Sequence, residues 1–300
     1  MLSVIIPFHN EEKNLTLLHK ELVPVLKKLN KEYELVLVND GSTDTSQKEA
    51  EALIKKDATV KLVVVWKRSG KGKALAEGIK QARGETLIFM DADLQDDPKD
   101  IPNLLKKLEE GLDFVNGIRM IRKDHSLVLL YSSLANKLIR KILKSPFTDV
   151  NCPFKVMKRE VLNDVVFYGN NFRFLPLAIY YQGHAVGEIP VQNRPRKYGV
   201  SKFGTGKLMT GLFDTLTAYF LYRFSESPLH FFGPVGIFVF LGGLIITSNL
   251  AIQRIFYGRL LYRRPILNLG VLLIIVGIQI VMTGIIGELI VYFHKKNGKK

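Results

Sequence analysis

The stretch Leu87-Ile-Phe-Met-Asp-Ala-Asp-Leu-Gln-Asp-Asp-Pro98 is an apolar run that ends abruptly in two carboxylates, Asp91 and Asp93. Because nothing polar interrupts Leu87–Met90, we predict a short strand that is buried on both faces. Open α/β folds bind their ligands where such strands end. Neighbouring carboxylates repel each other unless a cation neutralises them, and Mg²⁺ is commonly held by one or two carboxylates together with phosphates. The alternative is a turn in which one aspartate only caps a helix near Pro98.

Residues 1–117 alternate between short apolar strands and helices, which predicts an α/β fold with a mostly parallel, doubly wound sheet. Leucines at helical spacing between Leu15 and Leu29 predict a helix, with Asn10 as its N-cap. A Val-rich segment ending at Trp66 is interpreted as a fully buried strand. Glu188–Val191 is expected to be an edge strand because it contains a proline. The remaining predicted strands are Ser3–Pro7, Tyr33–Val38, Lys61–Trp66, Thr86–Met90 and Asp113–Asn116.

The formal net charge of the 300-residue chain is +15, which fits nucleic acid or, alternatively, an anionic membrane surface and phosphate-bearing substrates. Residues 229–252 and 266–293 are apolar stretches, each long enough to cross a bilayer core of roughly 30 Å. A soluble nucleic-acid-binding protein does not need them, so we expect no nucleic-acid partner. Gly233, Gly236, Gly242 and Gly243 are expected to form a close-packing face on the first span.

Three regions are predicted along the chain: a catalytic domain over 1–203, an amphipathic interfacial helix region over 204–228, and a membrane domain over 229–300. Cys152 is the only cysteine, so no intrachain disulfide is possible and a reducing compartment fits. The first residues lack the pattern of a secretory leader. We therefore expect a multi-pass protein of the cell membrane whose catalytic domain faces the cytoplasm.

Three polar segments follow predicted strands and are expected to lie on the same rim as Asp91. Pro7–Glu11 follows the first strand, and Asn39–Asp44, containing Asp40, follows the second. Asp40 can accept a hydrogen bond from a nucleobase, although such a segment is also a common turn. Lys67–Lys73 combines glycines and lysines before a helix, as an anion-binding loop does, although a solvated basic loop has the same composition.

Taken together, these segments resemble the inverting family 2 glycosyltransferases with a GT-A fold. Within that family, Asp149-Val-Asn-Cys-Pro-Phe-Lys155 and Arg196-Lys-Tyr-Gly-Val-Ser-Lys202 are similar to signatures of the polyprenyl-phosphate glycosyltransferases, such as dolichol-phosphate mannose synthases and undecaprenyl-phosphate sugar transferases. The two C-terminal apolar stretches match the membrane-anchored members of this group. The resemblance covers nearly the whole chain.

The resemblance implies roles for individual residues. Asp91 and Asp93 would be catalytic, with Asp91 beside the donor sugar and Asp93 binding Mg²⁺ or Mn²⁺ with help from Gln95. The implied nucleotide-binding residues are Pro7, Glu11, Asn39, Asp40 and Lys71, and the implied lipid-phosphate ligands are Arg119, Arg122, Arg196, Ser201 and Lys202.

The resulting hypothesis is metal-dependent transfer of a hexose from UDP-glucose or GDP-mannose to dolichyl or undecaprenyl phosphate, by a membrane-bound homo-oligomer. A phosphate acceptor is already anionic at pH 7, so positioning and charge neutralisation matter more than a general base. One alternative is a membrane-bound polysaccharide synthase. Two spans are few for a translocation channel, and the sequence lacks a Gln-x-x-Arg-Trp motif, so both observations argue against it. The other is a non-catalytic lipid-phosphate-binding subunit, against which the intact Asp91-Ala-Asp93 argues.

Overall fold

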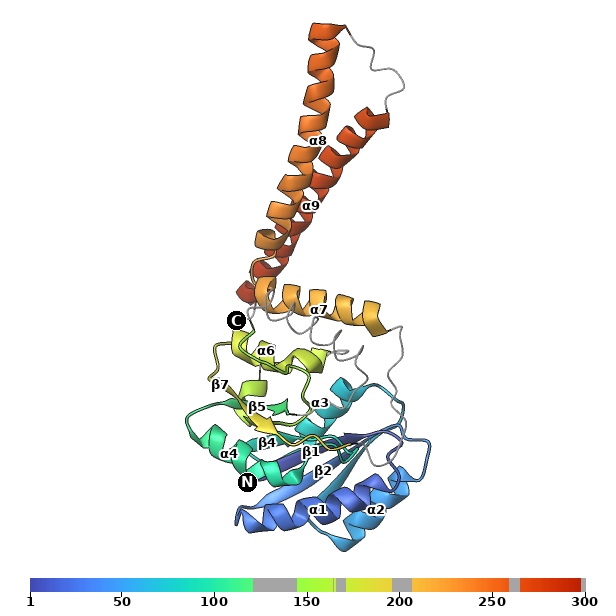
Figure 1. Ribbon diagram of the computed structural model, residues 1–300, viewed down its shortest axis with the longest axis vertical. Coiled ribbons are helices and arrows are strands. Elements are labelled where there is room, and N and C mark those ends of the chain that lie inside the picture. The colour runs from blue at the N-terminus through green and yellow to red at the C-terminus, as the bar shows by residue number, and fades with distance from the viewer. Residues whose placement is uncertain (121–144, 164, 166–170, 196–206, 259–264, 298–300) are drawn as a thin grey trace. The chain divides into compact units, whose positions relative to one another are not determined.

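The computed structural model describes residues 1–120, 145–163, 165, 171–195, 207–258 and 265–297 (Figure 1). The chain divides into two compact units, Met1–Ala218 and Tyr219–Lys300. The first unit holds a sheet covered by helices, and the second consists mainly of two long helices.

The sheet of the first unit has strand order β3-β2-β1-β4-β6-β5-β7. The pairs β1–β2, β2–β3, β1–β4 and β5–β7 are parallel, and β6 is antiparallel to both of its neighbours. The predicted α/β fold with a mostly parallel sheet is thus confirmed, and β7 with its proline is an edge strand as expected. The strands are β1 (Leu2–Phe8), β2 (Tyr33–Asp40), β3 (Val60–Val65), β4 (Thr86–Phe89), β5 (Phe114–Arg119), β6 (Lys155–Lys158) and β7 (Val186–Val191).

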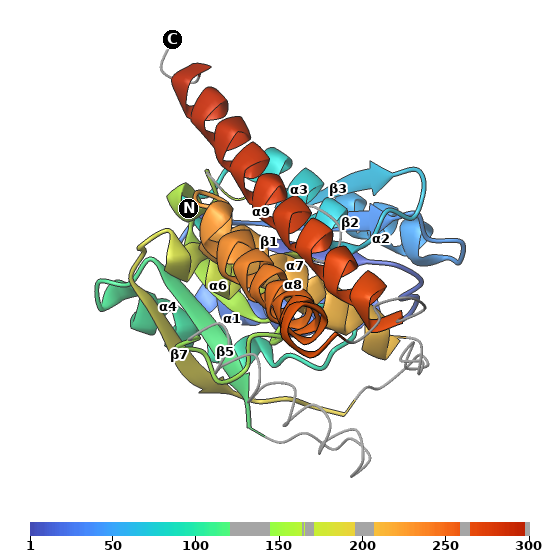
Figure 2. The ribbon, with the colours of Figure 1, turned by 90° about the horizontal axis from the view of Figure 1, so that it is seen from above.

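Helices cover both faces of this sheet (Figures 1 and 2). Side chains alternate along β1, so that Val4 and Ile6 join the core shared with α1, α2 and α4, whereas Ile5 faces α3. At Gly78 of α3 an added Cβ would lie 2.6 Å from Ile5, so this glycine lets the helix approach the sheet closely. The helices of this unit are α1 (Asn14–Lys28), α2 (Ser46–Lys56), α3 (Lys71–Gln81), α4 (Ile101–Glu109) and α6 (Leu175–Tyr181), with 3₁₀ turns η1 (Pro98–Asp100), η2 (Arg159–Leu162) and η3 (Asn171–Phe174). The sequence of α7 (Lys207–Phe224) contains the boundary between the two units.

Two local predictions are wrong. Trp66 is 94% exposed rather than buried, because β3 is the edge strand of the sheet and ends at Val65. Asn10 does not cap α1, which begins only at Asn14. Instead, the Glu49 carboxylate on α2 accepts hydrogen bonds from the backbone N–H groups of Lys13 (2.9 Å) and Thr16 (2.8 Å). A side chain from another helix therefore satisfies the first turn of α1.

The second unit contains α8 (Leu229–Tyr257) and α9 (Pro265–Asn297), and both helices are long and apolar enough to cross a membrane. Each is longer than the span predicted from the sequence. The helices pack through glycines: an added Cβ at Gly243 would lie 2.6 Å from the Gly270 carbonyl, and one at Gly277 would lie 2.6 Å from the Phe240 nitrogen. The expected glycine face is therefore wrong in part, since a Cβ at Gly242 would meet no atom within 4 Å.

Glu288 of α9 has a partner within the same unit. Its carboxylate accepts a hydrogen bond of 3.2 Å from the backbone N–H of Leu229, the first residue of α8. A carboxylate at a helix N-terminus satisfies an N–H group that has no partner in the helix itself, and its charge is favourable there. The acidic residue in an otherwise apolar helix thus joins α9 to the start of α8.

Candidate active site

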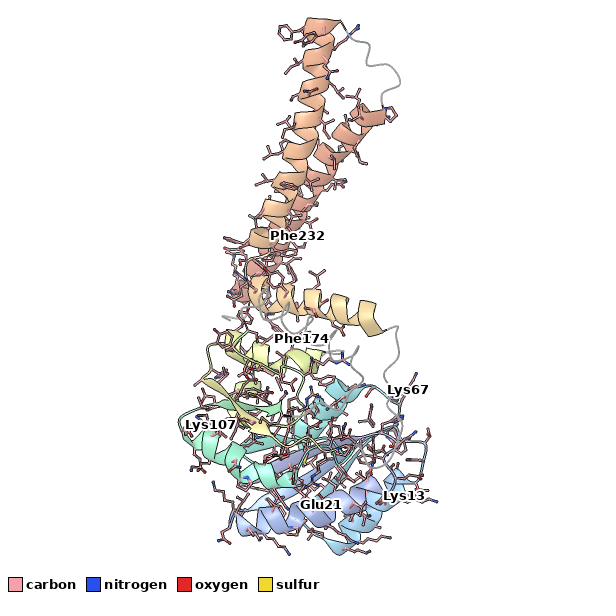
Figure 3. The ribbon with its side chains drawn as sticks, viewed as in Figure 1. Lys13, Glu21, Lys67, Lys107, Phe174 and Phe232 are labelled. Atoms are coloured by element: carbon pink, nitrogen blue, oxygen red, sulfur yellow. The ribbon has the colours of Figure 1, made fainter. Side chains whose placement is uncertain are left out.

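The polar segments predicted to share a rim do lie at the carboxyl ends of adjacent strands. The parallel register places Phe8 beside Asn39 and Asp40 beside Val65, and β4 runs parallel to β1 on its other side. The segments that follow β1, β2, β3 and β4 therefore gather at one edge of the sheet, where α/β folds bind ligands. Figure 3 shows Lys67, just beyond β3, and Lys13, before α1, at this end of the unit.

Asp40 is buried and organises the basic loop after β3. Its carboxylate accepts hydrogen bonds from the backbone N–H (2.7 Å) and hydroxyl (3.1 Å) of Ser69 and from the backbone N–H of Gly70 (3.0 Å). The next residue, Gly41, has φ +64°, and an added Cβ would lie 2.5 Å from the Arg68 nitrogen. The turn after β2 and the loop after β3 are thus packed backbone to backbone.

The other predicted nucleotide-binding residues near β1 and β2 are also held by local contacts. Asn39 accepts from the backbone N–H of Ser42 (2.8 Å) and donates to the Gln47 side chain (3.0 Å). Glu11 accepts from the Asn14 side chain (2.7 Å). Asn39 is only 1% exposed, so it stabilises the turn that presents Asp40. Direct contacts of Asn39 and Glu11 with a nucleotide stay predictions.

The acidic segment after β4 contains a third carboxylate. Lys71, at the start of α3, pairs with Asp91. The Asp93 carboxylate accepts from the backbone N–H of Gln95 (3.2 Å), across a turn whose middle residue, Leu94, has φ +64°. Asp96 is completely buried and accepts from the backbone N–H of Asp91 (3.3 Å). Burial, followed by the charges of the two neighbouring aspartates, raises the pKa of Asp96 to about 7.

These residues suit a divalent cation, although they do not form a complete metal site by themselves. In the part of the chain that the structure describes, no three His, Cys, Asp or Glu side chains converge on one point. Mg²⁺ and Mn²⁺ are often held by one or two protein carboxylates and completed by substrate phosphates, so Asp93 and the neighbouring Gln95 remain a fitting donor set. The Oδ1 atom of Asp96 is buried without a hydrogen-bond partner among the described residues. Excess negative charge at this point would be relieved by a cation.

The alternative interpretation of the first two aspartates as helix caps is wrong. The 3₁₀ turn at Pro98 is capped by Asp97, whose side chain accepts a 3.0 Å hydrogen bond from the backbone N–H of Lys99. Asp91 and Asp93 are therefore not needed to start α4.

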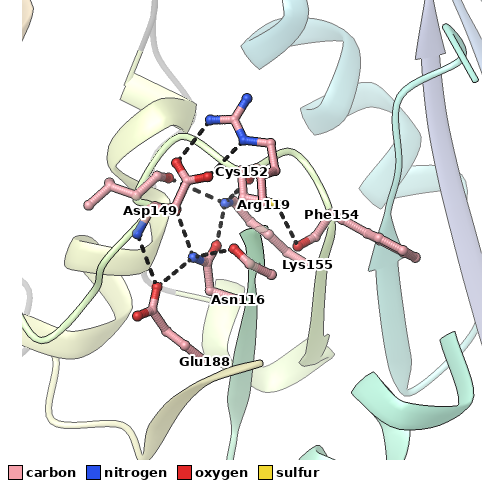
Figure 4. Close-up of polar contacts among 9 residues, drawn as sticks. Asn116, Arg119, Asp149, Cys152, Phe154, Lys155 and Glu188 are labelled. Carbon is pink, nitrogen blue, oxygen red and sulfur yellow. Dashed lines mark hydrogen bonds and ion pairs between the residues drawn. The ribbon is translucent and has the colours of Figure 1, made fainter. Parts of the chain in front are cut away.

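A polar network fixes the segment between residues 148 and 155 (Figure 4). Asn116 of β5 donates to the Asp149 carbonyl (2.9 Å) and to the Glu188 carboxylate (3.1 Å). Glu188 in turn accepts from the backbone N–H groups of Thr148 (2.7 Å) and Asp149 (3.3 Å). Buried Lys155 donates to the Asn116 side chain (2.7 Å) and to the carbonyls of Val150 (3.4 Å) and Cys152. This segment is consequently held by side chains from three strands, β5, β6 and β7.

Arg119, a predicted lipid-phosphate ligand, belongs to the same network. Its Nε and Nη2 atoms lie 2.7 and 2.9 Å from the two carboxylate oxygens of Asp149. Burial by itself would lower the pKa of this guanidinium, but Asp149 outweighs that effect and raises it. Burial lowers the pKa of Lys155 to about 8 and raises that of the Cys152 thiol to about 12. Contact between Arg119 and a phosphate stays a prediction, and Arg122, Arg196, Ser201 and Lys202 lie outside the described residues.

A small cavity, partly open to solvent, lies beside Asp91. Pro7, Lys71 and Asp91, all predicted site residues, line it. Asn151 and Lys155, which stand in the Asp149–Lys155 signature, also line the cavity, as do Phe172 and Arg173, for which the sequence indicated no role. Lys71 Nζ lies 5.5 Å from the centre of the Phe172 ring, a cation–π contact. No local sequence pattern marks Phe172 and Arg173 as site residues, because only the folded chain brings η3 next to β4.

Comparisons with known proteins show the family to which the chain belongs. The profile of glycosyl transferase family 2 matches residues 3–166. The dodecaprenyl-phosphate galacturonate synthase of Rhizobium johnstonii is 32% identical over 294 residues, covering 96% of this chain and 87% of the relative. The undecaprenyl-phosphate 4-deoxy-4-formamido-L-arabinose transferase of Proteus mirabilis is 31% identical over 290 residues, covering 96% and 87%.

Solved structures agree on the fold. Glucosyl-3-phosphoglycerate synthase from Mycobacterium tuberculosis, in complex with Mn²⁺, UDP-glucose and phosphoglyceric acid, superposes with a TM-score of 0.58 at 19% identity, covering 74% of this chain and 79% of that one. The fold and the acidic end of β4 define a glycosyltransferase of the GT-A type. This chain belongs to glycosyl transferase family 2, and the resemblance to its polyprenyl-phosphate members is confirmed by the relatives.

Proposed function

We propose that this chain transfers a sugar from a nucleoside-diphosphate sugar to the phosphate of a polyprenyl phosphate. One observation carries the proposal: the pair of Lys71 and Asp91 stands at a cavity next to buried Asp93, at the carboxyl end of β4. This arrangement supports a role of Lys71 toward the diphosphate and of Asp91 toward the sugar. Relatives that match nearly the whole chain are named for transfer to dodecaprenyl and undecaprenyl phosphate, which supports the acceptor.

The proposed glycosyl transfer needs no covalent intermediate with the protein. A phosphate oxygen of the acceptor attacks the anomeric carbon of the sugar, a new carbon–oxygen bond forms, and the bond from that carbon to the diphosphate breaks. The acceptor phosphate is already ionised at pH 7, so no proton has to be removed first. Positioning and neutralisation of charge therefore account for the rate, and a single displacement inverts the anomeric centre.

The residues at the carboxyl ends of the strands have separate proposed roles in binding the donor and stabilising charge. Asp40 holds the Ser69–Gly70 loop and retains lone pairs for a base N–H, so it is our proposed base contact. Lys71 begins α3, where a helix N-terminus and a lysine both favour the diphosphate. Asp91 lies beside the donor sugar and stabilises positive charge that develops at the anomeric carbon. Pro7, which lines the cavity, limits the nucleotide pocket at β1.

Asp93, with Gln95, would hold Mg²⁺ or Mn²⁺. The bound ion would act as a Lewis acid on the departing diphosphate. The solved Mycobacterium tuberculosis structure with Mn²⁺ and UDP-glucose supports a divalent ion in this fold, while the choice of metal for this chain is part of the proposal.

The architecture suits a lipid acceptor. A polyprenyl chain stays in the bilayer, so the transferase must work at the membrane surface. The two apolar helices α8 and α9 would anchor it there as a multi-pass protein. We propose that the catalytic unit lies on the cytoplasmic side. The basic residues at the end of α9 support this side, although the connector 253–265 is basic as well.

The donor is proposed as a hexose nucleotide, UDP-glucose or GDP-mannose. The relatives extend the candidates, since one is named for galacturonate and the other for 4-deoxy-4-formamido-L-arabinose. The test uses the full-length protein in detergent with undecaprenyl or dolichyl phosphate and Mg²⁺ or Mn²⁺. Each nucleotide sugar is supplied separately, and the lipid is followed by mass spectrometry. We expect a sugar–phosphate–lipid from one donor, whereas nucleotide binding without lipid product from any donor would contradict the proposal.

A further inference from the structure

The cavity beside Asp91 is lined by more positive than negative charge. Lys71, Lys155 and Arg173 line it, and Asp91 is its carboxylate. Lys71 is paired with that carboxylate and is the proposed ligand of the donor diphosphate. The charges of Lys155 and Arg173 are therefore the ones left over for a ligand that enters the cavity.

The ammonium group of Lys155 is not expected to bind such a ligand, because its donors are already used. An ammonium group has three N–H donors, and Lys155 directs bonds to the Asn116 side chain, the Val150 carbonyl and the Cys152 carbonyl. The side chain is only 4% exposed, and burial of a charge is costly. Its contacts fix the segment that supplies Asn151 and Pro153 to the cavity wall. Lys155 is thus a positioning residue that also adds positive charge to the cavity.

Arg173 is in a different situation. It is half-buried on η3, and no ion pair joins it to a carboxylate in the part of the chain that the structure describes. The neighbouring Phe172 packs its ring against the Lys71 ammonium, which ties η3 to the start of α3. A guanidinium presents a fork of donors that fits two oxygens of a phosphate or carboxylate.

We propose that Arg173 binds the phosphate of the lipid acceptor in this cavity, with Lys155 holding in place the segment that supplies Asn151 and Pro153 to the cavity wall. This inference rests on the proposed function. The attacking phosphate oxygen must come within bonding distance of the anomeric carbon, which lies beside Asp91, and the cavity is the space next to that carboxylate. The sugars in the names of the relatives differ, but a polyprenyl phosphate is common to them. A cationic side chain in this position can therefore bind the phosphate of a polyprenyl phosphate, whichever sugar is transferred.

Equilibrium binding to the full-length protein in detergent tests this without any need for turnover. Farnesyl phosphate and farnesol are titrated by calorimetry into the wild type and into Arg173→Gln, Arg173→Lys and Lys80→Gln. Lys80→Gln removes the same charge from an exposed pair with Glu77 and is the matched control. We expect Arg173→Gln to weaken farnesyl phosphate binding by about tenfold to a hundredfold, Arg173→Lys to restore part of it, and Lys80→Gln to have no effect.

Titration with UDP-glucose checks that each variant is folded. Titration with UDP-glucuronate checks whether Arg173 binds a carboxylate of the donor sugar instead of the phosphate of the lipid. Unchanged donor affinity together with weakened farnesyl phosphate binding supports the inference. Wild-type affinity of Arg173→Gln for farnesyl phosphate overturns it. Selective loss of UDP-glucuronate also overturns it, because Arg173 would then recognise a donor carboxylate. The proposed function is tested by a different measurement: it is contradicted if the wild type forms no lipid-linked sugar from any donor.

Discussion

Asp40 lies between two segments that meet only in the folded chain. Its two oxygens accept from the Ser69 and Gly70 backbones, so the carboxylate expected to contact the base also shapes the loop beside it. Asp40→Asn removes the charge and one acceptor oxygen. We expect nucleotide affinity to fall by about tenfold or more, since hydrogen bonds to charged groups are strong. The chain has one tryptophan, Trp66, exposed at the start of this loop, and its fluorescence can follow the titration with UDP or GDP.

Lys80→Gln is again the control for that titration, because it lies on the exposed face of α3. Nucleotide affinity of Asp40→Asn equal to that of the wild type would show that neither the base contact nor the shape of the loop depends on this carboxylate.

Glu34 gives a prediction for stability that is independent of catalysis. It is 3% exposed and accepts from the Ser3 hydroxyl (2.6 Å), the Lys61 ammonium (2.5 Å) and the Arg83 backbone N–H (2.5 Å). Burial by itself would raise the pKa of Glu34, but these hydrogen bonds outweigh burial and lower it below its ordinary value of 4.5. The charged form therefore stabilises the fold above about pH 4.5, and this contribution is lost as the pH falls through the lowered pKa.

Glu34→Gln is accordingly expected to reduce the free energy of unfolding by about 1.5–3 kcal/mol at pH 7, and by less as the pH falls below 4.5. Urea titrations followed by circular dichroism at several pH values measure this, with exposed Glu32→Gln as the control. An equal loss of stability at pH 7 and at pH 3 would contradict the assigned role of the charge.

At the scale of elements, strands and helices were predictable because their apolar patterns are local. β1, β2 and β4 were found this way, and so was the helix that starts near Asn14. The burial of Trp66 was predicted wrongly because edge or centre is a property of the strand order, which no single strand reveals. The cap of α1 was missed because Glu49 supplies it from another helix.

The pairing of α8 with α9 depends on glycines in contact. An added Cβ at Gly277 would lie 2.6 Å from the Phe240 backbone, whereas one at Gly242 would meet nothing within 4 Å. We expect Gly277→Leu to destabilise the helix pair by about 1–3 kcal/mol through overpacking, and Gly242→Leu to be nearly neutral. Thermal unfolding of the full-length protein in detergent compares the two. Similar melting temperatures for both variants would contradict the packing described for these helices.

At the scale of the whole molecule, the residues at the carboxyl ends of the strands were predictable from the sequence. The cavity residues Phe172 and Arg173 were not. Asp40, Lys71, Asp91 and Asp93 stand in short motifs directly after strands, and topology alone brings strand ends together. Arg173 stands in no such motif. A second feature, the polar network of Asn116, Asp149, Lys155 and Glu188, forms only because β5, β6 and β7 are neighbours in the sheet. No local sequence pattern predicts that strand order.

The link between the acidic end of β4 and glycosyl transfer is the central claim, and one comparison tests it most directly. Wild type and Asp93→Ala, both full-length and both shown to be folded by circular dichroism, are incubated with the preferred nucleotide sugar, polyprenyl phosphate and Mg²⁺ or Mn²⁺. The sugar–phosphate–lipid is quantified by mass spectrometry. We predict product from the wild type and a loss of at least about a hundredfold in Asp93→Ala, as expected when a metal-dependent electrostatic contribution is removed. Wild-type amounts of product from Asp93→Ala would contradict the account.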